Sequence, residues 1–173
     1  DQSYSIPVIT LKVRTAEDRD YEAIAAIYYE AIAQGGITMD TQPYTPQKVQ
    51  TIARNMGGRE ALLVGEHEGQ IIGWGKLQRY SDRSGFRFCC ETSVYLSFLS
   101  VGQGHGSILQ SALMKRAHTE GYRHIVAKIL AVNQRSIRFH QHFDFEIVGT
   151  QEKIGFINET WHNVVIMQYL MPE

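Results

Sequence analysis

Three glycines, Gly102, Gly104 and Gly106, alternate directly before an apolar-periodic run. Glycine tolerates positive φ and lets a ligand approach the backbone closely. Successive bare N–H groups that lead into a helix N-terminus form a binding place for an anion, to which the helix dipole adds. The stretch is therefore suited to a phosphate or pyrophosphate group. The alternative is a turn that only admits tight packing of the helix on the preceding strand.

The same residue types exclude several other kinds of site. No Gly-Lys-Ser/Thr ends the glycine stretch, and Gly102-x-Gly104-x-Gly106 is one residue shorter than the dinucleotide motif. Cys89 and Cys90 are adjacent, so in a strand they point to opposite faces and suit neither a zinc site nor a disulfide framework. His140 and His142 are two residues apart and do not share a helix face. We therefore predict no metal site.

Composition places the chain among ordinary globular proteins. It has 173 residues, 43% hydrophobic and 20% charged, with a formal net charge of −1. This balance predicts one domain over residues 1–173 and no nucleic-acid or membrane partner. The first residues lack the basic and apolar regions of a signal peptide, so we expect residues 1–7 to be a flexible extension. Two reduced cysteines fit a cytoplasmic protein.

Hydrophobic periodicity predicts a mixed α/β fold with a largely antiparallel sheet flanked by helices. Helices are expected after a Thr15/Asp18 capping box up to Gly35-Gly36, from Thr45-Pro46 to about Asn55, after the glycines, and over 133–142. Strands are expected over 8–14, in a hairpin over 61–80, and over 85–99, 124–131, 145–153 and 162–171. A parallel step is expected where the glycine-led helix crosses between two strands.

The order of strand, Gly-x-Gly-x-Gly, helix, strand and "NQRSIRFHQHFDF" resembles the GCN5-related N-acetyltransferase (GNAT) family, from about Leu11 to Leu170. The stretches "AIYYEAI", "MDTQP", "DRSGFR", "ETSVYL" and "WHNVVIMQ" are similar to its phosphinothricin and methionine sulfoximine acetyltransferase branch. The resemblance implies the acyl-CoA N-acyltransferase fold, acetyl-CoA as co-substrate and a homodimer.

The resemblance also implies residues that hold acetyl-CoA. The backbone of Val94, Tyr95 and Leu96 would pair with the pantetheine arm, and the end of that strand would offer an N–H to the thioester carbonyl. The pyrophosphate would lie on backbone N–H groups of Gly102, Gln103, Gly104, His105, Gly106 and Ser107, and Asn133 and Ser136 would also contact the cofactor.

Three positions depart from the family pattern. Phe98 stands where the family often has Pro, and Asp144 stands where it usually has Gly. Val101 stands where the family usually has Arg or Gln. Val101 removes a side-chain phosphate contact worth about 1–3 kcal/mol, unless Gln103 or neighbouring N–H groups replace it.

Acetyl transfer to an amine needs a base that takes the amine proton. Glu91 matches a Glu of the branch beside the expected thioester, and a carboxylate between apolar neighbours tends toward a raised pKa. The alternative is a buried Glu that pairs with Arg87 or an N–H. His140 stands where many members have a tyrosine acid, and it is either that acid or a packed histidine.

Arg83 and Arg87 match two arginines of the branch, whose acceptors are amino acids. A guanidinium holds a carboxylate through two hydrogen bonds, so both are candidate substrate-binding residues, or else surface arginines. Tyr29 and Met39, with Tyr28 and Trp161, line an apolar pocket or belong to the core. Several acceptor positions differ from the branch, including Tyr29 for Asn, Met39 for Phe and Phe88 for His.

The leading hypothesis is therefore an acetyl-CoA-dependent N-acetyltransferase for the primary amine of a small molecule, an amino acid or an analogue of the phosphinothricin or methionine sulfoximine type. One alternative keeps the cofactor and changes the acceptor to a peptide N-terminus, a polyamine or an antibiotic amine. Another is a non-catalytic acyl-CoA-binding module. Turnover with any amine, measured as release of free CoA, separates an enzyme from a binding module.

Overall fold

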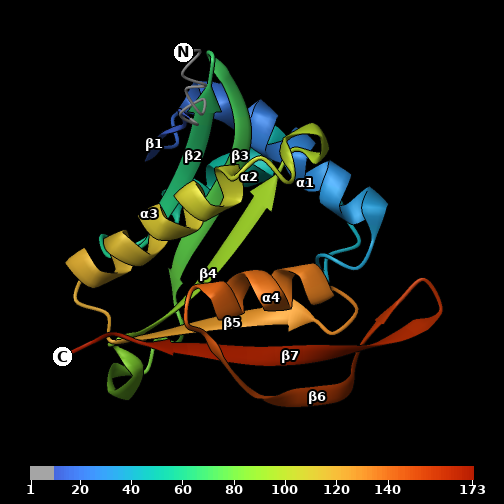
Figure 1. Cartoon of the computed structure of the whole chain (residues 1–173). Coiled ribbons are helices and arrows are strands. Elements are labelled where there is room, and N and C mark those ends of the chain that lie inside the picture. Colours follow the sequence, from blue (N-terminus) through green and yellow to red (C-terminus); the bar gives the residue numbers. More distant parts are fainter. Residues whose placement is uncertain (1–9) are drawn as a thin grey trace, which may run out of the picture.

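The computed structural model describes residues 10–173, which are built around a seven-stranded sheet (Figure 1). The expected extension over 1–7 and the start of the first expected strand lie outside the described residues. The strands are β1 (Lys12–Thr15), β2 (Ala61–His67), β3 (Gln70–Arg79), β4 (Cys89–Leu96), β5 (His124–Leu130), β6 (Glu146–Ile157) and β7 (Thr160–Leu170). The α-helices are α1 (Tyr21–Gln34), α2 (Pro46–Arg54), α3 (His105–Thr119) and α4 (Gln134–His142).

The strand order across the sheet is β1-β2-β3-β4-β5-β7-β6, and only β4 and β5 run parallel. The chain passes from β4 to β5 through α3, so the expected parallel step and the mixed α/β class are confirmed. No helix within residues 10–173 is both long and apolar enough to cross a membrane.

Helices cover the two faces of the sheet unequally. On β2, Ala61 and Leu63 belong to a core with α3 and α4, whereas Leu62 and Val64 belong to a second core with α1 and α2. The alternation follows from the strand period of two. On the described part of the chain, α1 and α2 lie over the N-terminal strands only, which leaves one face of β5 and β7 without a helix (Figure 1).

Strands β4 and β5 pair over a short distance and then separate. Their register covers only Cys89 to Glu91 on β4, opposite His124 to Val126 on β5. The remainder of β4, Thr92–Leu96, still pairs with β3 on its other side. The separation is visible in Figure 1, where β4 turns away from β5. One edge of β4 therefore has no strand partner from Thr92 onward, and such an edge can bind an extended chain.

The prediction of one long strand over 85–99 was wrong in its length. Strand β4 covers Cys89–Leu96 and is flanked by 3-10 turns at Ser84–Phe86 and Phe98–Ser100. The aromatic and aliphatic residues outside the strand are not core residues, since Phe86, Phe98 and Leu99 are exposed. Their apolar character indicates surfaces around the site rather than a longer strand.

The predicted capping box also lies elsewhere. Glu17 and Asp20 form it, two residues later than the Thr15/Asp18 pair, and it closes a 3-10 turn that leads into α1. Asp20 is fixed there by an ion pair with Arg14, 2.6 Å between Nη1 and Oδ2, which lowers the pKa of the carboxyl. The predicted stop of α1 at Gly35 is confirmed, with φ of 75° at that glycine.

Candidate active site

The three glycines of the 102–106 loop have two different structural roles. Gly102 and Gly104 both have φ of 84°, and Gly104 is the N-cap of α3. Gly106 has ordinary backbone angles, but a Cβ there would lie 3.3 Å from Cδ1 of Leu96. Two glycines are thus required by the turn, and the third by the close approach of α3 to the end of β4.

The backbone N–H groups of this loop are directed to no internal partner. Within residues 10–173, no backbone carbonyl accepts a hydrogen bond from the N–H groups of residues 102–107. The first turn bond of α3 at this end runs from Ile108 N–H to Gly104 O. A row of free donors at the N-terminus of a 15-residue helix fits a phosphate group.

A cavity of about 410 Å³ opens in front of this loop, and we call it the glycine-loop cavity. It brings together most of the residues predicted to hold a cofactor: Val94, Tyr95, Leu96, Gly102, Gly104, Gly106, Ser107, Asn133, Ser136, and also His140. They come from the free edge of β4, from the loop before α3 together with the first turn of that helix, and from α4 with its N-cap. Residues far apart in the sequence therefore form one elongated site.

The side chains of three of the predicted residues already make contacts within the protein. The Gln103 side chain donates to Leu99 O at 3.0 Å, so it is already paired. The His105 ring is buried 5.2 Å from the ring of His67. The Tyr95 ring lies in the core against Tyr28, and burial raises the pKa of its hydroxyl to about 12.

Arg135 is a residue of this cavity that the sequence analysis missed. It lies one residue after the start of α4, and its Nη2 atom would be 3.4 Å from a Cβ on Gly102. Val101 lines the same cavity. A cation therefore stands beside the loop from another helix, where Val101 offers none. The sequence could have indicated Arg135, because it is a basic residue two positions after Asn133. Asn133 caps α4 by accepting a hydrogen bond from the N–H of Ser136.

His140 is held in one tautomer at the inner wall of the cavity. Its Nδ1 lies 2.7 Å from the carbonyl oxygen of Ser136. A carbonyl only accepts, so Nδ1 carries the proton and Nε2 is the free lone pair. Burial lowers the pKa of His140, and the hydrogen bond to Ser136 only partly opposes this. The ring is therefore neutral near pH 7.

This burial predicts a pH-dependent stability. The unfolded chain takes up the His140 proton at higher pH than the folded chain, so stability should fall as pH drops below about 6.5. We expect His140→Gln to lose less stability than the wild type between pH 7.5 and 5.5, measured by urea unfolding. His142→Gln, exposed at the end of the same helix, should keep the wild-type dependence. Equal losses in the wild type and His140→Gln would contradict the assignment.

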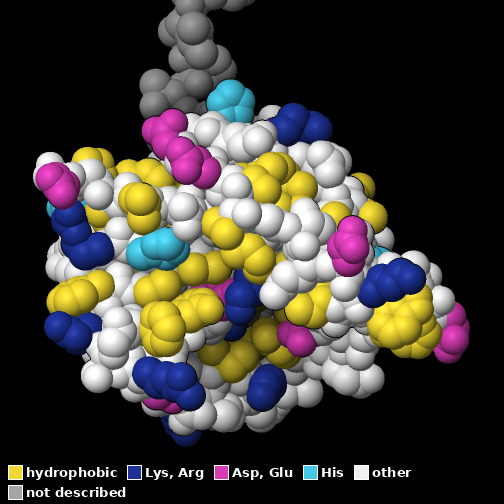
Figure 2. All heavy atoms as spheres, turned by 90° about the horizontal axis from the view of Figure 1, so that it is seen from below, with side chains coloured by type: hydrophobic (Ala, Val, Ile, Leu, Met, Phe, Trp, Pro, Cys, Tyr) yellow, Lys and Arg dark blue, Asp and Glu magenta, His cyan; other side chains and the backbone are white. Residues whose placement is uncertain are grey.

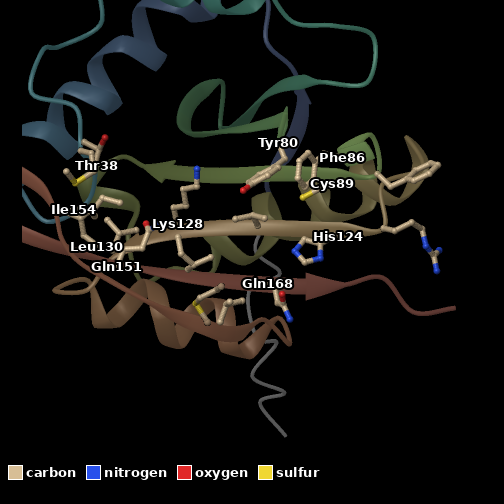
Figure 3. A pocket seen from close by; sticks show the side chains of 18 of the residues that line it. Thr38, Tyr80, Phe86, Cys89, His124, Lys128, Leu130, Gln151, Ile154 and Gln168 are labelled. Atoms are coloured by element: carbon tan, nitrogen blue, oxygen red, sulfur yellow. The ribbon is translucent and has the colours of Figure 1, made fainter. Parts of the chain in front are cut away.

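The second cavity lies on the face of β5 and β7 that no described helix covers, and we call it the open-face cavity. Its volume is about 850 Å³. Figure 2 shows a hollow on this side of the molecule, walled mainly by hydrophobic side chains with a basic and an acidic one among them. Figure 3 shows Tyr80, Phe86, Cys89 and His124 at one end, Thr38 and Ile154 at the other, and Lys128 between them.

Glu91 lies directly behind Lys128. The Nζ atom of Lys128 is 3.3 Å from Oε1 of Glu91, and Nε2 of Gln78 donates to Oε2 at 2.7 Å. The Glu91 side chain is 16% exposed and that of Lys128 is 50% exposed. The predicted apolar surroundings and the alternative partner Arg87 are thus wrong, whereas the alternative of pairing with an N–H agrees with the bond from Gln78 on β3.

The predicted acceptor-binding residues do not all reach the open-face cavity. Arg87 donates to Ser84 O at 3.0 Å and its guanidinium carbon lies 4.6 Å from the ring centroid of Phe88. Neither Arg87 nor Arg83 lines either cavity, and both are exposed. Met39 does line the open-face cavity. Tyr29 is exposed on α1 and lines neither cavity.

The other two residues of the predicted apolar pocket are also outside it. Tyr28 is core, and its hydroxyl lies 2.6 Å from Oγ1 of Thr38. Trp161 is exposed beside Phe156 on the β6–β7 hairpin.

The two cysteines point to opposite faces of β4, as the sequence predicts. Cys90 is buried in the core with α3, and burial raises the pKa of its thiol to about 12. Cys89 lines the open-face cavity. Both thiols are free. Within residues 10–173, no group of three or more His, Cys, Asp or Glu side chains is placed so that it could hold a metal ion.

The two cavities meet at Ile37, which lines both. Between them lies the point where β4 and β5 separate, and Glu91 is the last residue of β4 that pairs with β5. A ligand in one cavity can therefore approach a ligand in the other where the cavities meet at Ile37. Such an arrangement suits transfer of a group between a phosphate-bearing donor and a second small molecule.

Comparison with known proteins agrees with this geometry. A family model described as an acetyltransferase (GNAT) domain matches residues 13–166. The chain belongs to this family. Phosphinothricin N-acetyltransferase of Alcaligenes faecalis is 29% identical over 90% of this chain and 80% of its own length. The L-methionine sulfoximine/L-methionine sulfone acetyltransferase of Pseudomonas paraeruginosa is 29% identical over 92% of this chain and 94% of its own.

A solved structure shows the same fold with the donor bound. The phosphinothricin acetyltransferase of Sinorhizobium meliloti, in complex with acetyl-CoA, matches with a TM-score of 0.90 and 29% identity. The match covers 95% of this chain and 90% of that one. The chain is therefore an acetyl-CoA-dependent N-acetyltransferase, and the resemblance stated from its motifs is confirmed. The free N–H row and the unpaired edge of β4 fit this cofactor.

Proposed function

We propose that this enzyme acetylates the primary amine of an amino acid or a close analogue, in the open-face cavity. The observation that carries the proposal is the position of Glu91 at the last β4–β5 pair, where its carboxylate contacts Lys128, a residue that lines the open-face cavity. Relatives named for phosphinothricin and for methionine sulfoximine, both amino-acid analogues, support the acceptor class.

The glycine loop and its neighbours hold the donor in this proposal. Acetyl-CoA, when bound, supplies the acetyl thioester. Backbone N–H groups of Gly102 to Ser107 receive the pyrophosphate, and the free edge of β4 at Val94 to Leu96 receives the pantetheine arm. Arg135 supplies the cation that Val101 does not, since its guanidinium already stands beside Gly102. Asn133 and Ser136 complete the wall from the start of α4.

Glu91 acts as the base, directly or through water. An amine is nucleophilic only when neutral, so its proton must leave before or during the transfer. The carboxylate has two oxygens, and one is held by Gln78, which fixes its orientation. The other faces Lys128 and thus the cavity in which the acceptor lies.

His140 has no proton available for the departing CoA thiolate in this arrangement. Its proton is on Nδ1 and is directed to Ser136, so the neutral ring offers a lone pair at Nε2. The departing CoA thiolate, with the ordinary thiol pKa near 8.5, can leave without an acid. We therefore assign His140 to the shape of the glycine-loop cavity rather than to proton transfer.

A panel of amines tests the proposal. Wild-type protein with acetyl-CoA should release free CoA with L-methionine sulfone, phosphinothricin or other amino acids, and much more slowly with polyamines or peptides. A preference for polyamines or peptide N-termini would contradict the proposed amino-acid acceptor and would indicate one of those amines instead. Acetyl-CoA binding without CoA release from any amine would indicate a binding module and would overturn the proposed activity.

We further propose that the enzyme is a cytoplasmic homodimer. Apolar side chains are exposed along β6 and β7, including Ile147, Val148, Phe156 and Trp161, and β6 is an edge strand. Such a surface is suited to a second copy of the chain. Two free cysteines fit a reducing compartment.

Sedimentation at micromolar concentration should give the mass of two chains, and a joint Phe156→Glu and Trp161→Glu variant should give that of one. A wild-type monomer would refute the dimer.

A further inference from the structure

We propose that Lys128 binds the carboxylate of the acceptor and, by leaving Glu91, frees that residue for the amine. The inference rests on the proposed function and names what the open-face cavity recognises. It assigns to Lys128 the role that the sequence analysis gave to Arg83 and Arg87.

The position of Lys128 carries the proposal. The residue lies on β5, beyond the last pair that this strand makes with β4. Figure 3 shows its side chain rising from β5 in the middle of the cavity, toward β4. Its ammonium is 3.3 Å from Glu91 and 5.8 Å from the ring centroid of Tyr80. Lys128 lines the cavity, and its side chain is half exposed.

The other cations near the cavity are less suited to this role. Arg87 is committed to Ser84 O and the Phe88 ring. Arg123 lines the cavity but precedes β5. Lys76 lies on β3 and is not among the lining residues. Among the described residues that line the cavity, Lys128 is thus the basic residue that also contacts Glu91.

An ion pair beside the base has a consequence for specificity. Glu91 does not line the cavity itself, so an incoming amine meets Lys128 before it reaches the carboxylate. An α-amino acid carries an ammonium and a carboxylate on one carbon. It can exchange partners with the ion pair, with its carboxylate on Lys128 and its amine on Glu91. An amine without a carboxylate leaves the pair closed, and its reaction must break a partly buried ion pair without replacement.

The test compares the rate of acetylation of an amino acid with that of its carboxamide, which lacks the negative charge. With L-methionine sulfone and its carboxamide as probes, wild-type enzyme should prefer the acid by about 10-fold to 100-fold in kcat/KM, since a charge-assisted hydrogen bond is lost in the amide. Lys128→Met should abolish the preference, mainly through a higher KM for the acid. Lys128→Arg should restore most of it. Calorimetry with CoA-saturated protein should show the same preference in binding, without turnover.

Matched variants separate this role from a general effect of charge. Arg123→Met removes one positive charge from the same cavity without touching Glu91, and Arg87→Met removes the arginine predicted from the resemblance. Both should keep the wild-type preference for the acid. Circular dichroism should show that every variant is folded.

The outcomes distinguish this inference from the proposed function. CoA release from acid and amide at equal rates in the wild type would overturn the role of Lys128 alone. So would a preference that persists in Lys128→Met or disappears in Arg87→Met. Absence of CoA release from the wild type with every amine of the panel would overturn the proposed function, and this inference with it.

Discussion

Replacing Glu91 by glutamine should lower kcat by about 10²–10⁴-fold, the usual contribution of a general base. Glutamine keeps the shape of the side chain and an oxygen that can accept from Gln78, but it cannot take up a proton. The Kd for acetyl-CoA should hardly change, because Glu91 is not among the residues of the glycine-loop cavity. Steady-state kinetics at several pH values, with calorimetry for acetyl-CoA, provide both measurements.

A purely structural Glu91 would give another result. If Glu91 only anchors Lys128, then Glu91→Gln should raise the acceptor KM and leave kcat intact. Gln78→Met is the matched control, because it removes the second partner of the carboxylate and keeps the base. We expect a modest loss of kcat in that variant, far smaller than in Glu91→Gln.

Gly104→Val should weaken acetyl-CoA binding well over tenfold. At φ of 84° a β-branched residue is strained, and its side chain would occupy the cavity where the pyrophosphate approaches the backbone. Calorimetric titration with acetyl-CoA measures the loss. Arg135→Met should give a smaller loss, about tenfold, as expected for one charge-assisted contact at a solvent-exposed position.

The matched control for backbone strain is Gly121→Val. Gly121 has φ of 85°, open space around its Cβ position, and lies past the other end of α3. Both valine variants should lose stability to a similar extent in urea unfolding, and only Gly104→Val should lose affinity. A folded Gly104→Val protein with wild-type affinity would contradict the role of the loop.

Local sequence patterns predicted the parts of this enzyme that depend on neighbouring residues. The glycine loop, the helix after it and the hairpin over 61–80 follow from backbone preferences over a few positions, and Gly69 between the two hairpin strands has φ of 78°. The parallel step from β4 to β5 follows from the crossing helix. Each of these features is encoded within a single segment.

Features that depend on register between distant segments were not predictable in the same way. Lys128 meets Glu91 because β5 pairs with β4 up to that residue and then separates. Arg135 meets Gly102 because α4 is placed against the loop before α3. In both cases the residues belong to separate elements, and periodicity within one element gives no information on their distance.

Arg83 and Arg87, the acceptor-binding cations that the resemblance implies, do not line the open-face cavity. Both stand at positions that match arginines of the family branch. In the segment around the 3-10 turn at Ser84–Phe86, the residues that line the cavity are instead Gly85, Phe86 and Phe88. Arg87 is held by a bond within that turn.

Identification of the product tests the central claim most directly. Wild-type protein is incubated with acetyl-CoA and L-methionine sulfone, free CoA is measured, and the acceptor is analysed by mass spectrometry. We predict one N-acetylated molecule of L-methionine sulfone for each CoA released, and almost none with Glu91→Gln. Release of CoA without an acetylated acceptor, or equal product from the wild type and Glu91→Gln, would contradict the account.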